Sequence, residues 1–185
     1  MQTVLADTGL NSVLLALKAT HPRNDGLVVE RISEIFSGML ERGRARARAE
    51  VEADRAEVID NGLVAIVRNP REVATNEILF ERGVHVIVYV DGHNIGVVRE
   101  RSQTVRMDDP ALRAVVEAAG EEVGVGDGTW FAHPAGFILA WGTRKAPATR
   151  PSQVIPDELA RAAAQLLYDG ATELRSRRTA ATSSN

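Results

Sequence analysis

Two arginines and a serine with the chemistry to bind phosphate stand close together, at Arg99, Arg101 and Ser102. Arginines at positions i and i+2 of a β-strand point to the same side of the strand. A guanidinium group can grip a phosphate with two parallel hydrogen bonds. The spacing therefore indicates a phosphate-binding strand end, and the alternative is an exposed strand end whose arginines pair with acidic residues.

A glycine-rich loop connects Gly126 and Gly128 to His133 and Gly136. Glycine lets a backbone approach a ligand closely and turn its N–H groups toward an anion. A histidine beside such a turn can donate a hydrogen bond or carry a proton near neutral pH. These residue types predict a binding loop rather than a catalytic apparatus, because the sequence contains no complete catalytic constellation.

Two other groups of polar residues favour a structural interpretation. Residues 91–94, Asp-Gly-His-Asn, contain an acid and a histidine that suit Mn²⁺ or Zn²⁺, but Asp-Gly is typical of a hairpin turn. Asp108 and Asp109 precede Pro110, which is typical of helix capping rather than of a catalytic carboxylate pair. Cysteine is absent, which excludes disulfides, thiolate catalysis and cysteine-ligated zinc. We expect no metal site in this chain.

Residues 63–174 have the pattern of a mixed α/β domain that would position the candidate residues. Apolar runs rich in β-branched residues predict strands, and apolar residues spaced three or four apart predict helices. The expected strands are 63–67, 84–90, 95–101 and 137–141, and the expected helices are 70–82, 110–120 and 156–174. This order predicts an α/β fold with a mixed sheet of about four to five strands and flanking helices. A flexible polar tail is expected over 175–185.

Residues 1–62 have a helical pattern, with a short helix over 10–19 and a long helix over 27–60. One face of the long helix carries Val28, Ile32, Ile35, Phe36 and Met39. A helix of this length would measure about 50 Å, which is long for a globular core. We therefore expect it to connect parts of the protein or to pair with another chain.

The composition is ordinary for a soluble protein, with 44% hydrophobic residues and a net charge of −3. This charge provides no global attraction for nucleic acid. The first residues lack the basic start and apolar core of a signal peptide, and no apolar run approaches the ~20 residues of a membrane span. We expect a cytoplasmic protein without a membrane partner.

The order of these motifs resembles the DHH-associated C-terminal domain of DHH-family phosphoesterases, over roughly residues 63–145. That domain has a strand ending in Arg-Ser, then a helix, then a glycine-histidine loop followed by small residues, Gly and Phe. Arg101 and Ser102 match the Arg-Ser, and Gly126, Gly128 and His133 stand in for the glycine-histidine loop. Gly136 and the following phenylalanine match its end. The sequence departs from the pattern because its glycines are not consecutive and because Trp-Phe-Ala stands between them and the histidine.

The resemblance implies a domain that binds the phosphate of a nucleotide or a short single-stranded oligonucleotide. Arg101, together with Arg99, would hold the phosphate, and His133 would donate a hydrogen bond to the phosphate or the sugar. In the family, hydrolysis belongs to a separate N-terminal domain that holds a pair of Mn²⁺ ions. Its motifs do not occur in this sequence, so the resemblance implies a phosphoesterase-related chain with no cofactor of its own that does not hydrolyse alone.

The alternative function is that of a non-catalytic interaction or assembly protein. Its long helix over 27–60 would form a homodimer or dock a partner protein, and the glycine loop would be only a tight connection. Both functions can hold at once, because a dimer can still bind a ligand.

Overall fold

The computed structural model describes residues 12–126, 128–143 and 145–182, and the chain forms two compact units. The first unit ends at Ala47 and the second begins at Arg48. The boundary therefore lies earlier than the one expected near residue 62. The last part of the expected helical segment belongs to the second unit, because it supplies apolar side chains and a strand to that unit's core.

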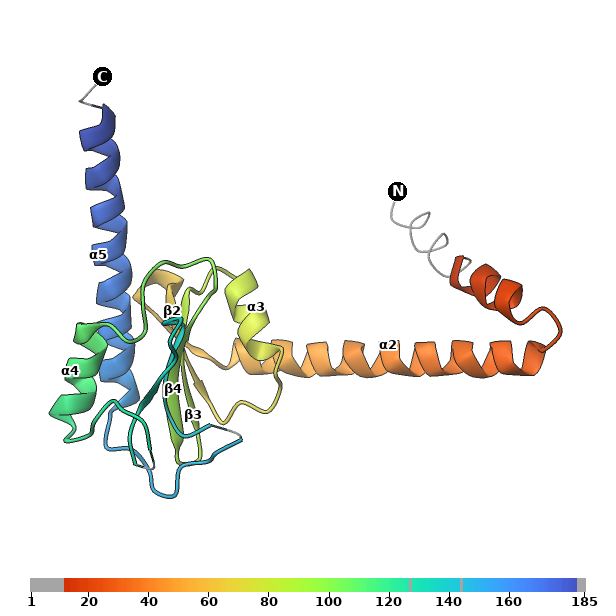
Figure 1. The fold of residues 1–185 in the computed structure, drawn as a ribbon, viewed down its shortest axis with the longest axis horizontal. Coiled ribbons are helices and arrows are strands. Elements are labelled where there is room, and N and C mark those ends of the chain that lie inside the picture. The colour runs from red at the N-terminus through yellow and green to blue at the C-terminus, as the bar shows by residue number, and fades with distance from the viewer. Residues whose placement is uncertain (1–11, 127, 144, 183–185) are drawn as a thin grey trace. The chain divides into compact units, whose positions relative to one another are not determined.

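The first unit contains a helix over residues 12–20 and the first part of α2 (Asp25–Asp54), drawn in red and orange in Figure 1. Asn24 caps α2, because its side-chain Oδ1 accepts a hydrogen bond of 3.1 Å from the backbone N–H of Leu27. α2 ends at Asp54 rather than near residue 60. The expected helix is shorter because the chain leaves it to form an edge strand.

The second unit is built on a mixed sheet of six strands in the order β1-β2-β3-β4-β6-β5. The strands are β1 (Glu57–Ile59), β2 (Val64–Arg68), β3 (Val86–Asp91), β4 (Asn94–Arg99), β5 (Phe131–Ala132) and β6 (Ile138–Trp141). β2 and β3 run parallel, and the other neighbouring pairs are antiparallel. The α/β fold class is confirmed. The two additional strands, β1 and β5, have only 3 and 2 residues, which is too short for an alternating pattern in the sequence.

Helices cover both faces of the sheet, as Figure 1 shows. α4 (Pro110–Ala118) and α5 (Pro156–Thr182) lie on one face, and α3 (Thr75–Glu81) lies on the other. The core under α4 and α5 includes Val64, Val86, Val97, Leu112, Leu139 and Leu159. The core on the α3 face joins the end of α2 to the sheet and includes Ala49, Ala53, Ala65, Ile78 and Ile87. Successive strand residues feed these two cores alternately, because side chains alternate across a strand.

The two structural interpretations of polar groups are confirmed. β3 and β4 form a hairpin in which Asp91 pairs with Asn94, and Gly92 takes a positive φ of 60° in the turn. Asp109 caps α4, because its side chain accepts a hydrogen bond from the backbone N–H of Ala111. These residues therefore have local structural roles that their sequence context indicates.

α5 continues to Thr182, through most of the stretch over 175–185 that was expected to be a flexible polar tail. Five of the eight residues over 175–182 are arginine or alanine, which are good helix formers. Residues 183–185 lie outside the described residues. Across the described part of the chain, we find no helix with the length and apolar character needed to cross a lipid bilayer.

Candidate functional site

The residues of the predicted phosphate site do not come together in one pocket. Gly126 and Gly128 precede β5, whereas His133 and Gly136 form the turn that links β5 to β6. β5 lies between these two pairs of residues in the chain, so the two pairs are at opposite ends of this strand. The glycine loop and the histidine turn are therefore two separate structural features.

The histidine turn is closed by hydrogen bonds within the turn. The carbonyl of His133 accepts a hydrogen bond of 2.7 Å from the N–H of Gly136, whose φ of 68° favours glycine. His133 Nδ1 accepts a hydrogen bond of 3.1 Å from the N–H of Ala135, so the proton of the neutral ring lies on Nε2. The ring also lies 3.9 Å from the ring of Phe137, centroid to centroid. The imidazole is held in one orientation, with Nε2 as its remaining donor.

The cation at this turn is Arg106, which sequence reasoning did not indicate. Its guanidinium donates to both carboxylate oxygens of Asp108, at 2.8 and 2.9 Å, and to the carbonyl of Pro134 at 3.2 Å. A Cβ at Gly136 would lie 2.9 Å from Arg106 Cζ, so any larger residue there would require this arginine side chain to shift. The hydrogen bond from Arg106 lowers the pKa of Asp108. The Arg-x-Asp spacing before a helix start is the sequence signal that could have indicated this pair.

Arg99 and Arg101 do not form the expected pair on one side of a strand, because β4 ends at Arg99 and Arg101 lies in the turn beyond it. The backbone N–H of Arg99 donates to the carbonyl of Phe137, so this strand end lies beside the histidine turn. However, the Arg99 side chain donates to the carbonyls of Glu100 and Arg101 at 2.9 and 3.2 Å. Arg99 therefore braces its own strand end, and Arg101 is exposed.

Ser102 belongs to a small polar cluster around Glu100. A hydrogen bond from Ser102 is the main cause of the lowered pKa of Glu100, and His85 and Gln103 add to it. Nδ1 of His85 lies 3.3 Å from Glu100 Oε2 and 3.0 Å from Gln103 Nε2. The acid between the two arginines is therefore held by a serine, a histidine and a glutamine, whereas the structural alternative expected the arginines themselves to pair with acidic residues.

The glycine loop lines a pocket of about 410 Å³ that contains Gly126 and Gly128 but none of the other predicted site residues. Its described lining residues carry no charged side chain. The base of the loop is fixed by Glu121, a carboxylate that is only 5% exposed. Glu121 accepts hydrogen bonds from Trp130 Nε1 at 2.8 Å, Ser152 Oγ at 2.6 Å and the N–H of Gln153 at 3.0 Å. This geometry suits a tight connection that is tied to the sheet.

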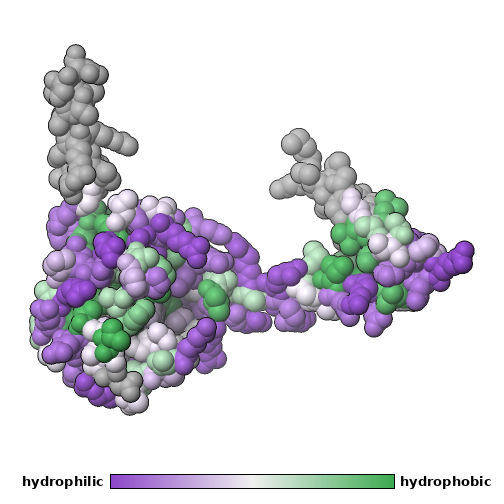
Figure 2. Space-filling model, viewed as in Figure 1, coloured by the Kyte–Doolittle hydropathy of each residue, from purple (hydrophilic) through white to green (hydrophobic). Residues whose placement is uncertain are grey.

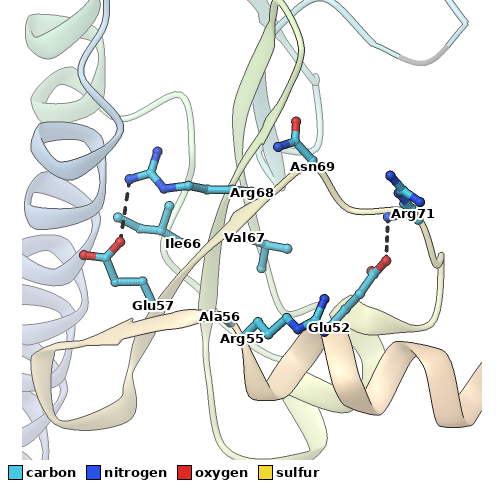
Figure 3. Close-up of a pocket in the computed structure, with 9 residues that line it drawn as sticks. All are labelled: Glu52, Arg55, Ala56, Glu57, Ile66, Val67, Arg68, Asn69 and Arg71. Atoms are coloured by element: carbon cyan, nitrogen blue, oxygen red, sulfur yellow. Dashed lines mark hydrogen bonds and ion pairs between the residues drawn. The ribbon is translucent and has the colours of Figure 1, made fainter.

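A larger pocket, of about 510 Å³, lies at the carboxyl end of β2 and is shown in Figure 3. We call it the arginine pocket, and it is lined by Glu52, Arg55, Ala56, Glu57, Ile66, Val67, Arg68, Asn69 and Arg71. Sequence analysis did not indicate this pocket. The available signal was the run Arg-Asn-Pro-Arg over 68–71, directly after a buried strand.

The first unit displays a different kind of surface. Its helices expose large apolar side chains, which are green on that unit in Figure 2. We call them the helical apolar surface: Val13, Leu15, Val29, Ile35, Phe36, Met39 and Leu40. Val29 and Leu40 are 62% and 61% exposed. Contiguous exposed apolar side chains of this kind mark interaction sites in soluble proteins.

Within residues 12–126, 128–143 and 145–182, no group of three or more histidines and acids is placed to hold a metal ion. No protein-family model matches the chain, and no curated protein matches it. The relation to DHH-family phosphoesterases stays a prediction. Nucleotide binding through Arg101, His133 and the glycine loop stays a prediction as well.

Proposed function

We propose that this protein is an assembly protein whose first unit joins two copies of the chain through the helical apolar surface. The observation that carries the proposal is the number of large apolar side chains that this short helical unit leaves exposed. Burial of apolar area stabilises association by about 25 cal/mol per Å², so these side chains favour a covered state. A second copy of the same unit supplies an equally apolar surface.

The apolar side chains of α2 occupy one side of the helix. At 100° per residue, Val28, Val29, Ile32, Ile35, Phe36, Met39 and Leu40 fall within an arc of about 140°. Only Val28 among them is fully buried. An arc of this width is typical of a helix that packs against a partner along its length.

The charges of α2 favour an antiparallel arrangement of two copies. Residues 25–36 contain three acids and one arginine, which gives a net charge of −2. Residues 37–47 contain three arginines and one acid, which gives a net charge of +2. Antiparallel helices place the acidic half of one copy beside the basic half of the other, and their macrodipoles also oppose. Parallel helices would place like charges together.

The proposal is tested by light scattering on two variants that add the same charge at neighbouring positions. Phe36→Asp places a carboxylate within the apolar arc, and Ser37→Asp places one on the opposite side of the helix. We expect Phe36→Asp to be monomeric and Ser37→Asp to remain a dimer. A monomeric wild-type chain, or a dimer that survives Phe36→Asp, would contradict the proposal.

Charge reversal tests the antiparallel arrangement. Arg42→Glu with Arg46→Glu turns the basic half from +2 to −2, so two acidic halves face each other and the dimer should weaken about tenfold. Adding Glu30→Arg and Glu34→Arg reverses the other half, and we expect association to recover. Circular dichroism checks that α2 stays helical in each variant. Recovery is not expected for a parallel pair, whose facing halves always carry like charges.

A further inference from the structure

We propose that the arginine pocket binds a phosphate-bearing small molecule of about nucleotide size. This site is separate from the residues that the sequence indicated, and it is independent of the assembly proposed for the first unit. Its volume of about 510 Å³ lies within the range of small-molecule sites in proteins.

The first argument is the charge that the pocket presents. Three arginines, Arg55, Arg68 and Arg71, are among the residues that line it. Among the contacts found within the described residues, the side chains of Arg55 and Arg71 make no hydrogen bond or ion pair. Guanidinium groups without protein partners are suited to a phosphate, which they bind by two parallel hydrogen bonds.

The third arginine is held only loosely by acids. Arg68 Nη2 lies 3.6 Å from a carboxylate oxygen of Glu57 and 3.9 Å from one of Asp157, both beyond the 2.7–2.9 Å of a strong charged hydrogen bond. Figure 3 shows Arg68 turned toward Glu57, on the other side of the pocket from Arg71. Exposed pairs of this length contribute little, so a phosphate can replace them.

The second carboxylate of the pocket, Glu52, is held by hydrogen bonds to the chain, and the lining residues carry three arginines against two acids. Its oxygens accept hydrogen bonds from the N–H of Arg71 at 2.9 Å, the N–H of Glu72 at 3.2 Å and the hydroxyl of Thr75 at 2.7 Å. Glu52 thereby fixes the segment that carries Arg71 against the end of α2. The carboxylate positions an arginine of the pocket while its own lone pairs are occupied.

The second argument is the position of the pocket in the sheet. β1 pairs with β2 only as far as Ile66, so among the described strands none covers this edge of β2 at Val67 and Arg68. Asn69 follows with a φ of 52°, a left-handed conformation that turns the chain sharply at the strand end. Ligands of open α/β sheets bind outside the carboxyl ends of their strands, where polar backbone groups and loops meet.

The uncharged lining indicates where the rest of the ligand would lie. Ala56 lines the pocket and is partly buried, whereas the side chains of Ile66 and Val67 are buried in the two cores on opposite faces of the sheet. A group attached to the phosphate would lie over Ala56 and the open edge of β2, while the phosphate meets the arginines. A nucleoside phosphate combines both parts, whereas a free phosphate uses only the arginines.

The experiment is calorimetry on the full chain with pyrophosphate, adenosine diphosphate and adenosine as probes. We expect both phosphate compounds to bind, adenosine diphosphate more tightly, and adenosine to give no heat. Arg55→Gln and Arg71→Gln should each weaken binding about tenfold, the loss expected for a charged hydrogen bond. Arg23→Gln, an exposed arginine in the first unit, is the matched control and should bind like the wild type.

Three results would overturn the proposal. The first is no binding of either phosphate compound to the folded wild-type chain at about 10 mM. The second is binding that the double variant Arg55→Gln with Arg71→Gln leaves unchanged while its thermal unfolding matches the wild type. The third is a loss on Arg101→Gln in place of these two, which would locate the anion at the end of β4. Dimerisation of the first unit is measured separately, so failure of either proposal leaves the other testable.

Discussion

The two units of this chain handle apolar residues in opposite ways. The second unit buries most of its large apolar side chains in two clusters, one on each face of the sheet, and those that it exposes are scattered over several elements. The first unit exposes most of the large apolar side chains of its two helices. The difference teaches that the α/β unit has a core of its own, whereas the helical unit leaves apolar area exposed that the proposed dimer would cover.

The largest expected effect contrasts the core of one unit with the surface of the other. Leu139 is fully buried, so Leu139→Ala should lower the free energy of unfolding by about 2–5 kcal/mol. Leu40→Ala removes the same atoms from the first unit, so it should leave the unfolding free energy of the second unit within about 0.5 kcal/mol of the wild type. Urea unfolding followed by tryptophan fluorescence reports the second unit, because both tryptophans lie there. Equal losses for the two variants would break the comparison.

The next effect tests whether the glycine loop is a tied connection. Glu121→Ala leaves one buried and two partly buried donors without this acceptor and should cost about 3 kcal/mol of unfolding free energy. Glu122 is the adjacent exposed acid, and Glu122→Ala serves as the control in the same urea titration. A loss below about 1 kcal/mol for Glu121→Ala would mean that the base of the loop is not fixed by this carboxylate.

A smaller effect separates two glycines with similar backbone conformations. Gly142 has a φ of 71°, and a Cβ there would lie 2.6 Å from the backbone nitrogen of Ala148. Gly142→Ala should therefore cost about 3 kcal/mol, from strain and collision together. Gly128 has a φ of 76° with open space around it, so Gly128→Ala should cost only about 1 kcal/mol. Thermal unfolding measures the loss of stability in each variant. A larger loss for Gly128→Ala than for Gly142→Ala would contradict the open space around Gly128.

Acid titration sharpens the account of the histidine turn. Arg106 holds the pKa of Asp108 below its ordinary value of 3.8 in the folded chain. The stability that this pair contributes is present above the ordinary value and is lost as the pH falls through the lowered pKa. In Asp108→Asn, the midpoint of thermal unfolding should depend less on pH below about 4 than in the wild type. If the pH dependence below about 4 is the same in Asp108→Asn as in the wild type, the Arg106–Asp108 pair does not stabilise the folded chain.

The smallest expected effect is the ionisation of Tyr89, in the second unit, at alkaline pH. Burial raises the pKa of Tyr89 to about 12, so its hydroxyl stays protonated in the folded protein beyond the ordinary value of 10.0. The corresponding stability is present below pH 10 and is lost as the pH rises toward 12. The chain has 2 tyrosines, so absorbance of the phenolate in Tyr168→Phe reports Tyr89 alone. Ionisation of that variant near pH 10 while it remains folded would contradict the burial of Tyr89.

Local signals in the sequence predicted the local features of the fold. Asp-Gly at residues 91–92 gave the hairpin, and Asp109 before Pro110 gave the start of α4, because both motifs act through neighbouring backbone groups. The apolar periodicity of α2 also identified the face that the structure leaves exposed. These features depend on residues within a few positions of one another.

The arrangement of the candidate site depends on contacts between residues far apart in the sequence, which no local sequence pattern predicts. Arg106 meets Gly136 across 30 positions, and the arginine pocket unites residues from α2, β2 and the loop that follows β2. Arg99 and Arg101 failed to form a pair because the strand ended between them. Likewise, the glycine loop and His133 were separated by β5, a strand of only 2 residues that the sequence pattern did not reveal.

Sedimentation equilibrium of the wild-type chain tests the proposed dimerisation most directly, because it measures the mass of the species in solution. The chain has a mass of 20.0 kDa, and the account predicts a species of twice that mass that dissociates on dilution and is absent in Phe36→Asp. A wild-type chain that stays at 20.0 kDa at every concentration studied would contradict it.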